Sequence, residues 1–179
     1  MSSYRWIPWT QPILSADNGY GLVSASSENT ASSAYPWKAS DGIKESETTS
    51  WEAAKDAYPA WWLWELPVTL KISHLTLYNK YSGHGYVTKN VSVYSDKART
   101  QLIASGTFEA ASFSTLTFDF AEPVITDALC VVCEDSYKES NTYVGLGEIE
   151  MTAEEGILQY SVRYQDWDGT LLKEETVDS

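Results

Sequence analysis

The sequence predicts an all-β sandwich or barrel, and three observations support this fold class. Short β-type runs recur along the chain, turn residues separate them, and no run carries the pattern of a three-turn amphipathic helix. The 179 residues suit one ordinary domain with an appendage. A hydrophobic content of 43% is sufficient for a packed core.

The runs define six main strands in chain order. These are Trp61–Leu66, Lys71–Tyr78, Asn90–Tyr94, Thr115–Phe120, Ala128–Cys133 and Tyr143–Met151. Because side chains alternate across a strand, we expect Trp62 and Trp64 to face the core together with Trp51, and Trp61 to face outward. Ala128–Cys133 is apolar without alternation, which is typical of a strand covered on both faces.

The two ends of the chain differ from this middle part. Residues 1–14 contain Pro8 and Pro12, which are unsuited to a central strand, so we expect a connector lying on the sandwich surface. Residues 153–179 alternate around the turn Asp166–Thr170 and predict a β-hairpin. A lone hairpin is marginal in water, so it either packs on the sandwich of residues 15–152 or begins a further, truncated module.

Charge excludes several classes of partner. The chain has 12 basic and 25 acidic side chains and a net charge of −13. Nucleic acids and anionic membranes both require a cationic face, so we expect neither as a partner. The first eight residues lack the pattern of a signal peptide, and no apolar run could span a membrane, so we expect a soluble chain.

Cys130 and Cys133 form a C-x-x-C pattern inside an apolar, β-branched run. Positions i and i+3 of a strand point to opposite faces, which disfavours a disulfide or a shared metal. We therefore expect buried structural thiols, with redox or metal use as the alternative. No zinc motif, nucleophile elbow or phosphate-binding loop is present, and nothing nominates a catalytic triad.

The stretch from Ala34 to Trp51 is dense in oxygen-bearing side chains around an Asp41-Gly42 turn. Carboxylates, hydroxyls and free loop carbonyls are the ligands that Ca²⁺ prefers. A solvated acidic loop without an ion has the same composition, and composition alone favours that interpretation.

Five motifs in order resemble those of the discoidin-like group, which comprises the F5/8 type C domains and the family 32 carbohydrate-binding modules. Ala39-x-Asp41-Gly42 followed by Thr49-x-Trp51 is similar to the A-x-D-G and T-x-W signature of that group. The other four similar segments are Val23–Asn29, Trp61–Leu66, Asn90–Asp96 and Gly145–Glu150. The likeness covers residues 15–152 and implies a discoidin-like jelly-roll β-sandwich, to which the C-terminal hairpin adds a short extension.

The resemblance also implies one structural Ca²⁺. In such domains the Asp of D-G, the Thr of T-x-W and the Glu of the closing strand hold the cation with nearby main-chain carbonyls. Carried over, the side-chain ligands are Asp41, Thr49 and Glu148. The carbonyls are expected near Lys38 and within residues 43–47.

Ligands of the group bind at loops on one end of the sandwich, where aromatic faces stack on sugar rings. The candidates in this chain are Trp37, Asn79, Lys80, Tyr81, His84, Tyr86, Tyr137 and Tyr143, with Asn141 beside them. Galactose binders of the group carry an Arg followed by an Asn near the strand ending at Tyr78. Here Asn79 and Lys80 stand there without an Arg, which argues against galactose itself.

The leading hypothesis is a non-catalytic, calcium-stabilised carbohydrate-binding module that serves adhesion or targeting within a larger protein. Tyr160–Leu172 resembles the start of repeats in surface proteins of Gram-positive bacteria and their phages, and the lead-in Tyr35–Gly42 is similar to discoidin-like domains of phage tail proteins. An extracellular, cell-surface or virion-surface parent with further modules is therefore expected. The alternative is a structural or protein-interaction module of a phage tail or surface protein without a sugar site, and a hydrolase is a third, less favoured hypothesis.

Overall fold

The computed structural model describes residues 3–16, 20–46, 48–81 and 86–179. Within these ranges it contains nine strands and two short 3-10 helices, and no α-helix. No helix in the described part is long and apolar enough to cross a membrane. The elements are β1 (Ser3–Trp9), β2 (Leu22–Ala25), η1 (Thr30–Ser32), η2 (Pro36–Ser40), β3 (Trp51–Glu52), β4 (Ala60–Asn79), β5 (Asn90–Tyr94), β6 (Leu102–Thr107), β7 (Thr115–Cys133), β8 (Gly145–Gln165) and β9 (Leu171–Asp178).

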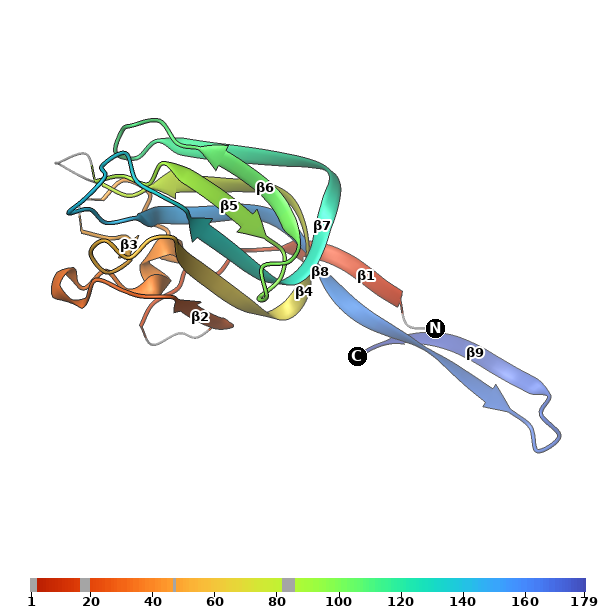
Figure 1. The fold of residues 1–179 in the computed structure, drawn as a ribbon. Coiled ribbons are helices and arrows are strands. Elements are labelled where there is room, and N and C mark those ends of the chain that lie inside the picture. Colours follow the sequence, from red (N-terminus) through yellow and green to blue (C-terminus); the bar gives the residue numbers. More distant parts are fainter. Residues whose placement is uncertain (1–2, 17–19, 47, 82–85) are drawn as a thin grey trace.

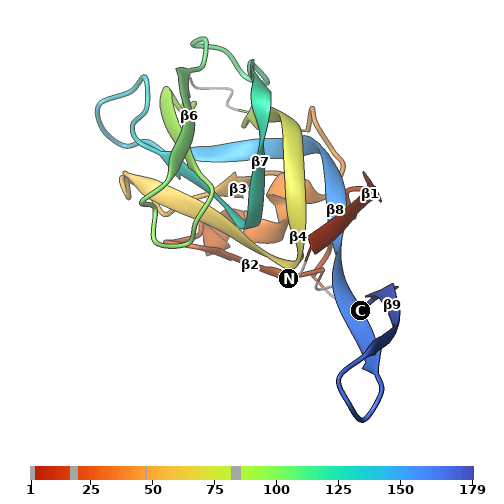
Figure 2. The ribbon, with the colours of Figure 1, turned by 90° about the vertical axis from the view of Figure 1, so that its right-hand side faces the viewer.

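Three long strands, β4, β7 and β8, build both layers of an antiparallel sandwich (Figures 1 and 2). The first half of β4 pairs with β2 and with the second half of β7, which continues to β5 and β6. The second half of β4 pairs with β8 and with the first half of β7. The register of β4 against β7 shifts between Glu65 and Leu70, around Pro67, where the strand turns from one layer to the other.

The all-β class and the discoidin-like sandwich are therefore confirmed, and the segmentation of the strands is corrected. Four predicted strands are halves of two long strands, because β4 and β7 stay extended through the irregularities that interrupt their pairing and bend them. β8 likewise runs through residue 153, the expected start of the hairpin segment. Ser3–Trp9, expected within a connector, pairs with residues 153–159 of β8 at the end of the sheet order, where Pro8 is tolerated.

The core lies between the layers and is rich in tryptophan. Trp51, Trp62 and Trp64 are fully buried and Trp61 is half-buried, which confirms the predicted alternation. The buried indoles donate hydrogen bonds to loop carbonyls, as a buried polar group requires. Trp62 Nε1 donates to the carbonyl of Pro36 at 2.8 Å and Trp64 Nε1 to that of Tyr20 at 2.8 Å. The loops before Asp41 are thereby fixed against the sandwich.

The two cysteines are free and buried on opposite faces of β7. Cys133 belongs to the main core, whereas Cys130 packs in a smaller cluster with Leu63, Ala128 and Val132. The expectation of a strand covered on both faces is thus confirmed. Burial raises the pKa of Cys130 to about 11 and that of Cys133 to about 12, so both thiols stay protonated at neutral pH.

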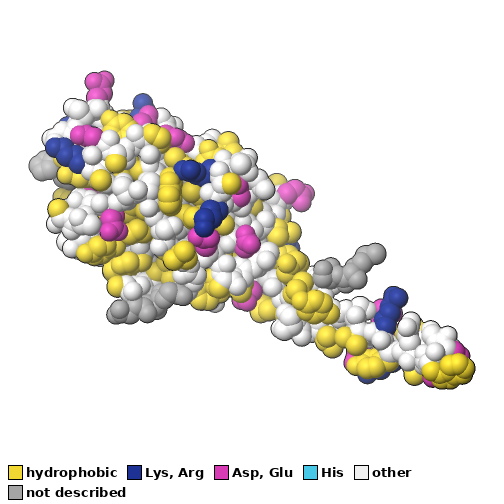
Figure 3. Space-filling view, turned by 60° about the horizontal axis from the view of Figure 1, so that its bottom comes forward, with side chains coloured by type: hydrophobic (Ala, Val, Ile, Leu, Met, Phe, Trp, Pro, Cys, Tyr) yellow, Lys and Arg dark blue, Asp and Glu magenta, His cyan; other side chains and the backbone are white. Residues whose placement is uncertain are grey.

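The end of β8 and β9 form a hairpin arm that projects from the sandwich (Figure 1). Tyr160, Val162 and Tyr164 alternate along one face of the arm, and Val177 pairs opposite Tyr160 on the same face. Hydrophobic side chains are visible along the arm and at its tip in Figure 3, and Trp167 in the turn is 93% exposed. This face therefore exposes aromatic and aliphatic side chains to solvent, with the Lys173–Glu175 ion pair among them.

Candidate functional site

Two groups of residues at the loop end of the sandwich form the candidate site. The first, the clasp, consists of Asp41, Gly42, Thr49 and Glu148. Pro36 begins η2 and Asp41 ends it, and Gly42 follows with a φ of +80°, a conformation that glycine adopts without strain. The anchored η2 helix thereby presents the Asp41-Gly42 turn to β8.

Glu148 contacts this turn from a distant part of the sequence. It lies on β8 opposite Tyr78 of β4, and it is only 1% exposed. Its Oε2 accepts a hydrogen bond from the backbone N–H of Gly42 at 2.9 Å, and Asp41 Oδ1 accepts one from Ile43 N–H at 3.0 Å. The structure therefore brings two of the expected metal ligands together across 107 positions of sequence.

The clasp contains unsatisfied oxygens. Thr49 Oγ1 and Glu148 Oε1 are buried and lack a hydrogen-bond partner. Burial, and next the negative charge of Asp41, raise the pKa of Glu148 to about 8, and burial also raises the pKa of Asp41. A buried acceptor without a donor is costly, and a cation beside Glu148 would satisfy its free oxygen and favour the ionised carboxylates. The residues present therefore fit a hard cation such as Ca²⁺.

Charged side chains alone would not supply enough ligands for a bound cation. The described residues contain no group of three or more His, Cys, Asp or Glu side chains around a common point. Loop carbonyls would have to supply the remaining ligands, as is common for Ca²⁺. The Lys38 side chain donates to the carbonyl of Thr48 at 3.1 Å, so its ammonium group ties η2 to the loop that carries Thr49. Residue 47, within the expected carbonyl segment, lies outside the described residues.

A cavity of about 280 Å³ opens beside the clasp. Glu148, Gly42 and Ser40 form one side of it, and the N-terminal segment forms another. The lining residues are Gln11, Pro12, Ile13, Ser40, Gly42, Glu148, Glu150 and Met151. The buried carboxylate thus has a route to solvent.

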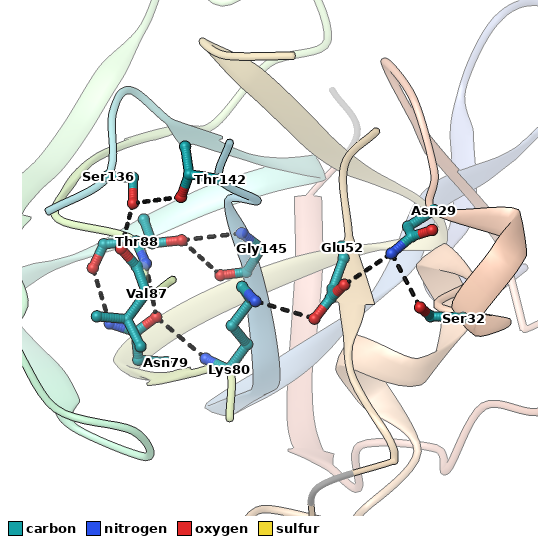
Figure 4. Close-up of polar contacts among 10 residues, drawn as sticks. All are labelled: Asn29, Ser32, Glu52, Asn79, Lys80, Val87, Thr88, Ser136, Thr142 and Gly145. Carbon is teal, nitrogen blue, oxygen red and sulfur yellow. Dashed lines mark hydrogen bonds and ion pairs between the residues drawn. The ribbon is translucent and has the colours of Figure 1, made fainter. Parts of the chain in front are cut away.

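The second group lies beneath and within the loops that join the strands at this end. Asn79 and Lys80, expected to contact a ligand directly, both point inward (Figure 4). Asn79 is fully buried: its amide donates to the carbonyl of Thr88 at 2.8 Å, and its Oδ1 accepts from the N–H of Thr88 at 3.1 Å. Asn79 therefore holds the segment before β5 against the end of β4.

Lys80 is part of a buried ion pair. Its Nζ donates to Glu52 Oε1 at 2.9 Å, and the lysine side chain is 2% exposed. The other carboxylate oxygen, Glu52 Oε2, accepts from Asn29 Nδ2 at 3.0 Å (Figure 4). This network ties the end of β4 to β3 and to the loop before η1. Sequence reasoning missed Glu52 and Asn29 because neither lies near Lys80 in the chain.

Four aromatic side chains lie in the loops that join β4 to β5, β6 to β7 and β7 to β8, and we call them the aromatic rim: Tyr81, Tyr86, Phe113 and Tyr143. Tyr81 stacks on Phe113 with ring centroids 5.6 Å apart, and Tyr86 meets Tyr143 edge to face at 6.3 Å. Lys80 Nζ lies 5.9 Å from the Tyr143 ring. All four side chains are partly exposed, and their loops gather at one end of the sandwich (Figure 1). The rim can therefore offer ring faces to a ligand.

The remaining candidates have separate surroundings. Tyr137 donates its hydroxyl to the carbonyl of Phe108 at 2.6 Å, beside the rim loops. Trp37 lines a cavity of about 190 Å³ with Leu14 and Val23, between η2 and β2. His84 lies outside the described residues. Lys138, which sequence reasoning did not nominate, places Nζ 3.8 Å from the centroid of the Tyr86 ring.

A row of hydroxyl, imidazole and carboxylate groups in contact lies elsewhere, on the surface where the second half of β4 pairs with the first half of β7. His74 Nε2 lies 3.0 Å from Thr76 Oγ1, and His74 Nδ1 lies 2.7 Å from Asp119 Oδ1. The Asp119 side chain is 84% exposed, and neither cavity described above is lined by any of the three. The arrangement is that of a cross-strand polar ladder on a sheet surface.

Comparison with known proteins defines the class of fold. No family model and no curated protein matches the sequence. Among solved structures, the family 32 carbohydrate-binding module of NanJ from C. perfringens, in complex with galactose, matches with a TM-score of 0.60 and 19% identity, over 74% of this chain and 92% of that module. A fucose-binding module from Streptococcus pneumoniae matches with a TM-score of 0.56 and 18% identity, over 74% and 90%.

The lectin domain of lectinolysin, complexed with Lewis B antigen, matches with a TM-score of 0.55 and 21% identity, over 77% of this chain and 97% of that domain. These are similarities of fold. The chain has the discoidin-like β-sandwich fold of the family 32 carbohydrate-binding modules, as its sequence motifs implied.

Proposed function

We propose that this chain is a non-catalytic carbohydrate-binding module whose ligand site is the aromatic rim. The observation that carries the proposal is the set of four partly exposed rings in these loops, of which Tyr143 lies 5.9 Å from Nζ of the buried Lys80. Aromatic faces bind sugar rings through their apolar C–H surfaces, and a few fixed polar groups then orient the hydroxyls. Among the similar structures, one is in complex with galactose, one is a fucose-binding module and one is complexed with Lewis B antigen, which supports the same class of ligand.

The buried pair also bears on which glycan is preferred. Because Glu52 neutralises Lys80 and encloses it, this lysine offers no free charge to an anionic sugar. The absence of an arginine beside Asn79 removes the polar pair expected for galactose recognition. We therefore expect a hexose or deoxyhexose other than free galactose, presented on a larger glycan; an acidic sugar would have to be met by Lys138, whose Nζ lies 3.8 Å from the Tyr86 ring centroid.

Ca²⁺ is the second part of the proposal. Asp41, Thr49 and Glu148 would hold it, with loop carbonyls such as that of Lys38. When bound, the cation supplies positive charge that offsets two buried carboxylates. The chain's own residues position the ligands. The Gly42 N–H orients Glu148, and Lys38 fixes the loop that carries Thr49.

A glycan array followed by titration of the tyrosine and tryptophan fluorescence tests the ligand proposal. Tyr86→Ala and Tyr143→Ala should each weaken binding about 10-fold or more, since a stacked ring contributes on the order of 1–3 kcal/mol by analogy with base stacking. Tyr164→Ala on the projecting arm is the matched control and should bind as the unmodified chain does. No binding across a broad panel of neutral and acidic glycans, or equal binding by all three variants, would exclude the rim as a sugar site.

The projecting arm favours a second candidate function, a protein-interaction module within a larger surface or phage tail protein. One of its faces exposes Tyr160 and Tyr164 beside the Lys173–Glu175 pair, and Trp167 is almost fully exposed at the tip. Exposed apolar surfaces of this kind mark contacts with other protein parts. Either role suits an extracellular or virion-surface protein, in which weak single sites gain avidity by repetition.

A further inference from the structure

The segment that follows β1 lies directly against the clasp. We call residues 11–14 the strap. Leu14 N–H donates to the carbonyl of Ser40 at 2.7 Å, which attaches the strap to the end of η2. Ile13 faces Gly42, where an added Cβ would lie 3.4 Å from the Ile13 side chain. The strap therefore touches the same turn that presents Asp41.

Gln11 connects the two halves of the clasp. Its Nε2 donates to Ser40 Oγ at 3.0 Å and to the carbonyl of Ile149 at 2.6 Å. Its Oε1 accepts from the N–H of Met151 at 2.8 Å. Ser40 immediately precedes Asp41, and Ile149 immediately follows Glu148. One amide side chain thus bridges the backbone beside one carboxylate and the backbone beside the other.

Two other contacts join the η2 turn and the residues after it to β8: the Gly42–Glu148 hydrogen bond and the ion pair between Lys44 Nζ and Glu150 Oε1 at 2.8 Å. Both end on a carboxylate side chain of β8, so without Gln11 no bond would join Ser40, beside Asp41, to the β8 backbone beside Glu148. A cation that must be shared by Asp41 and Glu148 is sensitive to any separation of these two segments, because ligand distances in such sites vary only over a few tenths of an ångström.

We infer that Gln11 is a positioning residue for the proposed cation site, and that docking of the strap and binding of the cation stabilise each other. The inference rests on the calcium part of the proposed function. Coupling free energies are reciprocal, so a strap that raises calcium affinity is itself held more firmly when calcium is bound. The strap also forms a wall of the cavity that leads to Glu148, so its docking limits access to the carboxylate.

Calcium titration by calorimetry tests the inference on three full-length proteins: the unmodified chain, Gln11→Ala and Gln159→Ala. Gln159 is the matched control, a glutamine whose amide donates to Asp178 at 3.0 Å on the arm. We expect Gln11→Ala to bind calcium about 5- to 30-fold more weakly, within the usual range of coupling between sites. The control should bind as the unmodified chain does.

A merely structural role for Gln11 would give a different result. Thermal unfolding in chelator would then show a less stable Gln11→Ala protein with an unchanged calcium dissociation constant, and the inference would be wrong. Hydrogen exchange on the unmodified chain gives the reciprocal readout without any variant. Calcium should slow exchange of the Leu14 amide, and an unchanged rate would also overturn the coupling. If the unmodified chain binds no calcium at all, the cation proposal itself fails and the coupling falls with it.

Discussion

Raising the pH of the calcium-free protein should destabilise it through one buried carboxyl group. Glu148 is almost fully buried next to Asp41, and its pKa lies at about 8 instead of the ordinary 4.5. The folded protein therefore holds this proton more tightly than the unfolded chain does. The resulting stabilisation is fully present below about pH 4.5 and is lost as the pH rises through about 8.

The size of the effect follows from the interval between these two pKa values. At about 1.4 kcal/mol per pH unit, the whole interval corresponds to at most about 5 kcal/mol, and the step from pH 5 to pH 7 to about 3 kcal/mol. For a chain of this length, 1 kcal/mol moves the melting temperature by about 2–4 °C. The melting temperature in chelator should therefore fall by about 6–12 °C between pH 5 and pH 7.

The assay is thermal unfolding in chelator from pH 5 to pH 8, comparing the unmodified chain with Glu148→Gln. Groups with lowered pKa values, such as Glu150, act in the opposite direction but are common to both proteins, so they cancel in the difference. The Gln variant should lose most of the decline and keep only the share that comes from Asp41, whose pKa burial also raises. Saturating calcium should remove the decline from the unmodified chain, since a bound cation favours the ionised carboxylate. Parallel curves for the two proteins in chelator would refute the reasoning.

Three further outcomes follow from the buried groups. Lys80→Met should lower the free energy of unfolding in urea by about 3 kcal/mol, because it leaves the Glu52 carboxylate without its partner. The double variant with Glu52→Gln should recover part of this loss. Additive losses from the two substitutions would contradict the prediction. Gly145→Ala should cost about 3 kcal/mol or more by the same measurement, because its Cβ would lie 2.0 Å from a backbone oxygen of β3. Cys130 and Cys133 should react with a thiol reagent at pH 8 only as fast as the protein unfolds, since their raised pKa values leave almost no thiolate; a rapid reaction of the folded protein would show that a thiol is accessible.

The core could be predicted from the sequence because alternation is a local property. Trp62, Trp64 and Leu66 alternate with outward residues, and all three are buried. The pattern shifts by one residue at the irregularity between Ile72 and His74, and a second alternation then runs through Leu75 and Leu77 to Asn79, so it includes the burial of Asn79. Treating Asn79 as a loop residue overlooked this signal.

Other features depend on contacts that no local pattern contains. Lys80 follows a buried residue and is also buried, because the pairing of β4 with β8 shifts register at Tyr78 and Asn79. Its partner Glu52 lies 28 positions earlier. Glu148 became a candidate only through the motif order, since periodicity says nothing about a residue so far from Asp41. Gln11 lies in the segment expected to be a connector, and its role appears only from its three hydrogen bonds.

The start of β8 joins the clasp to the aromatic rim. Gly145 donates its N–H to Thr88 Oγ1 at 2.8 Å beneath the rim, and Glu148 belongs to the clasp three residues later. Between them, Gly147 packs against Asn79 so closely that an added Cβ would lie 2.9 Å from the Asn79 carbonyl oxygen. A rigid, four-residue connection of this kind transmits small displacements, so we expect calcium removal to weaken glycan binding several-fold as well as to lower stability.

The same titration of intrinsic fluorescence, repeated in calcium and in chelator, measures this coupling. Glu148→Gln should bind glycan with an affinity that no longer depends on calcium, because it lacks one of the two carboxylates that the cation shares. Glycan affinity that is identical in calcium and chelator for the unmodified chain would mean that the clasp only stabilises the fold. The rim would then be set by the Lys80–Glu52 pair and Asn79 alone, whose contacts do not involve the clasp.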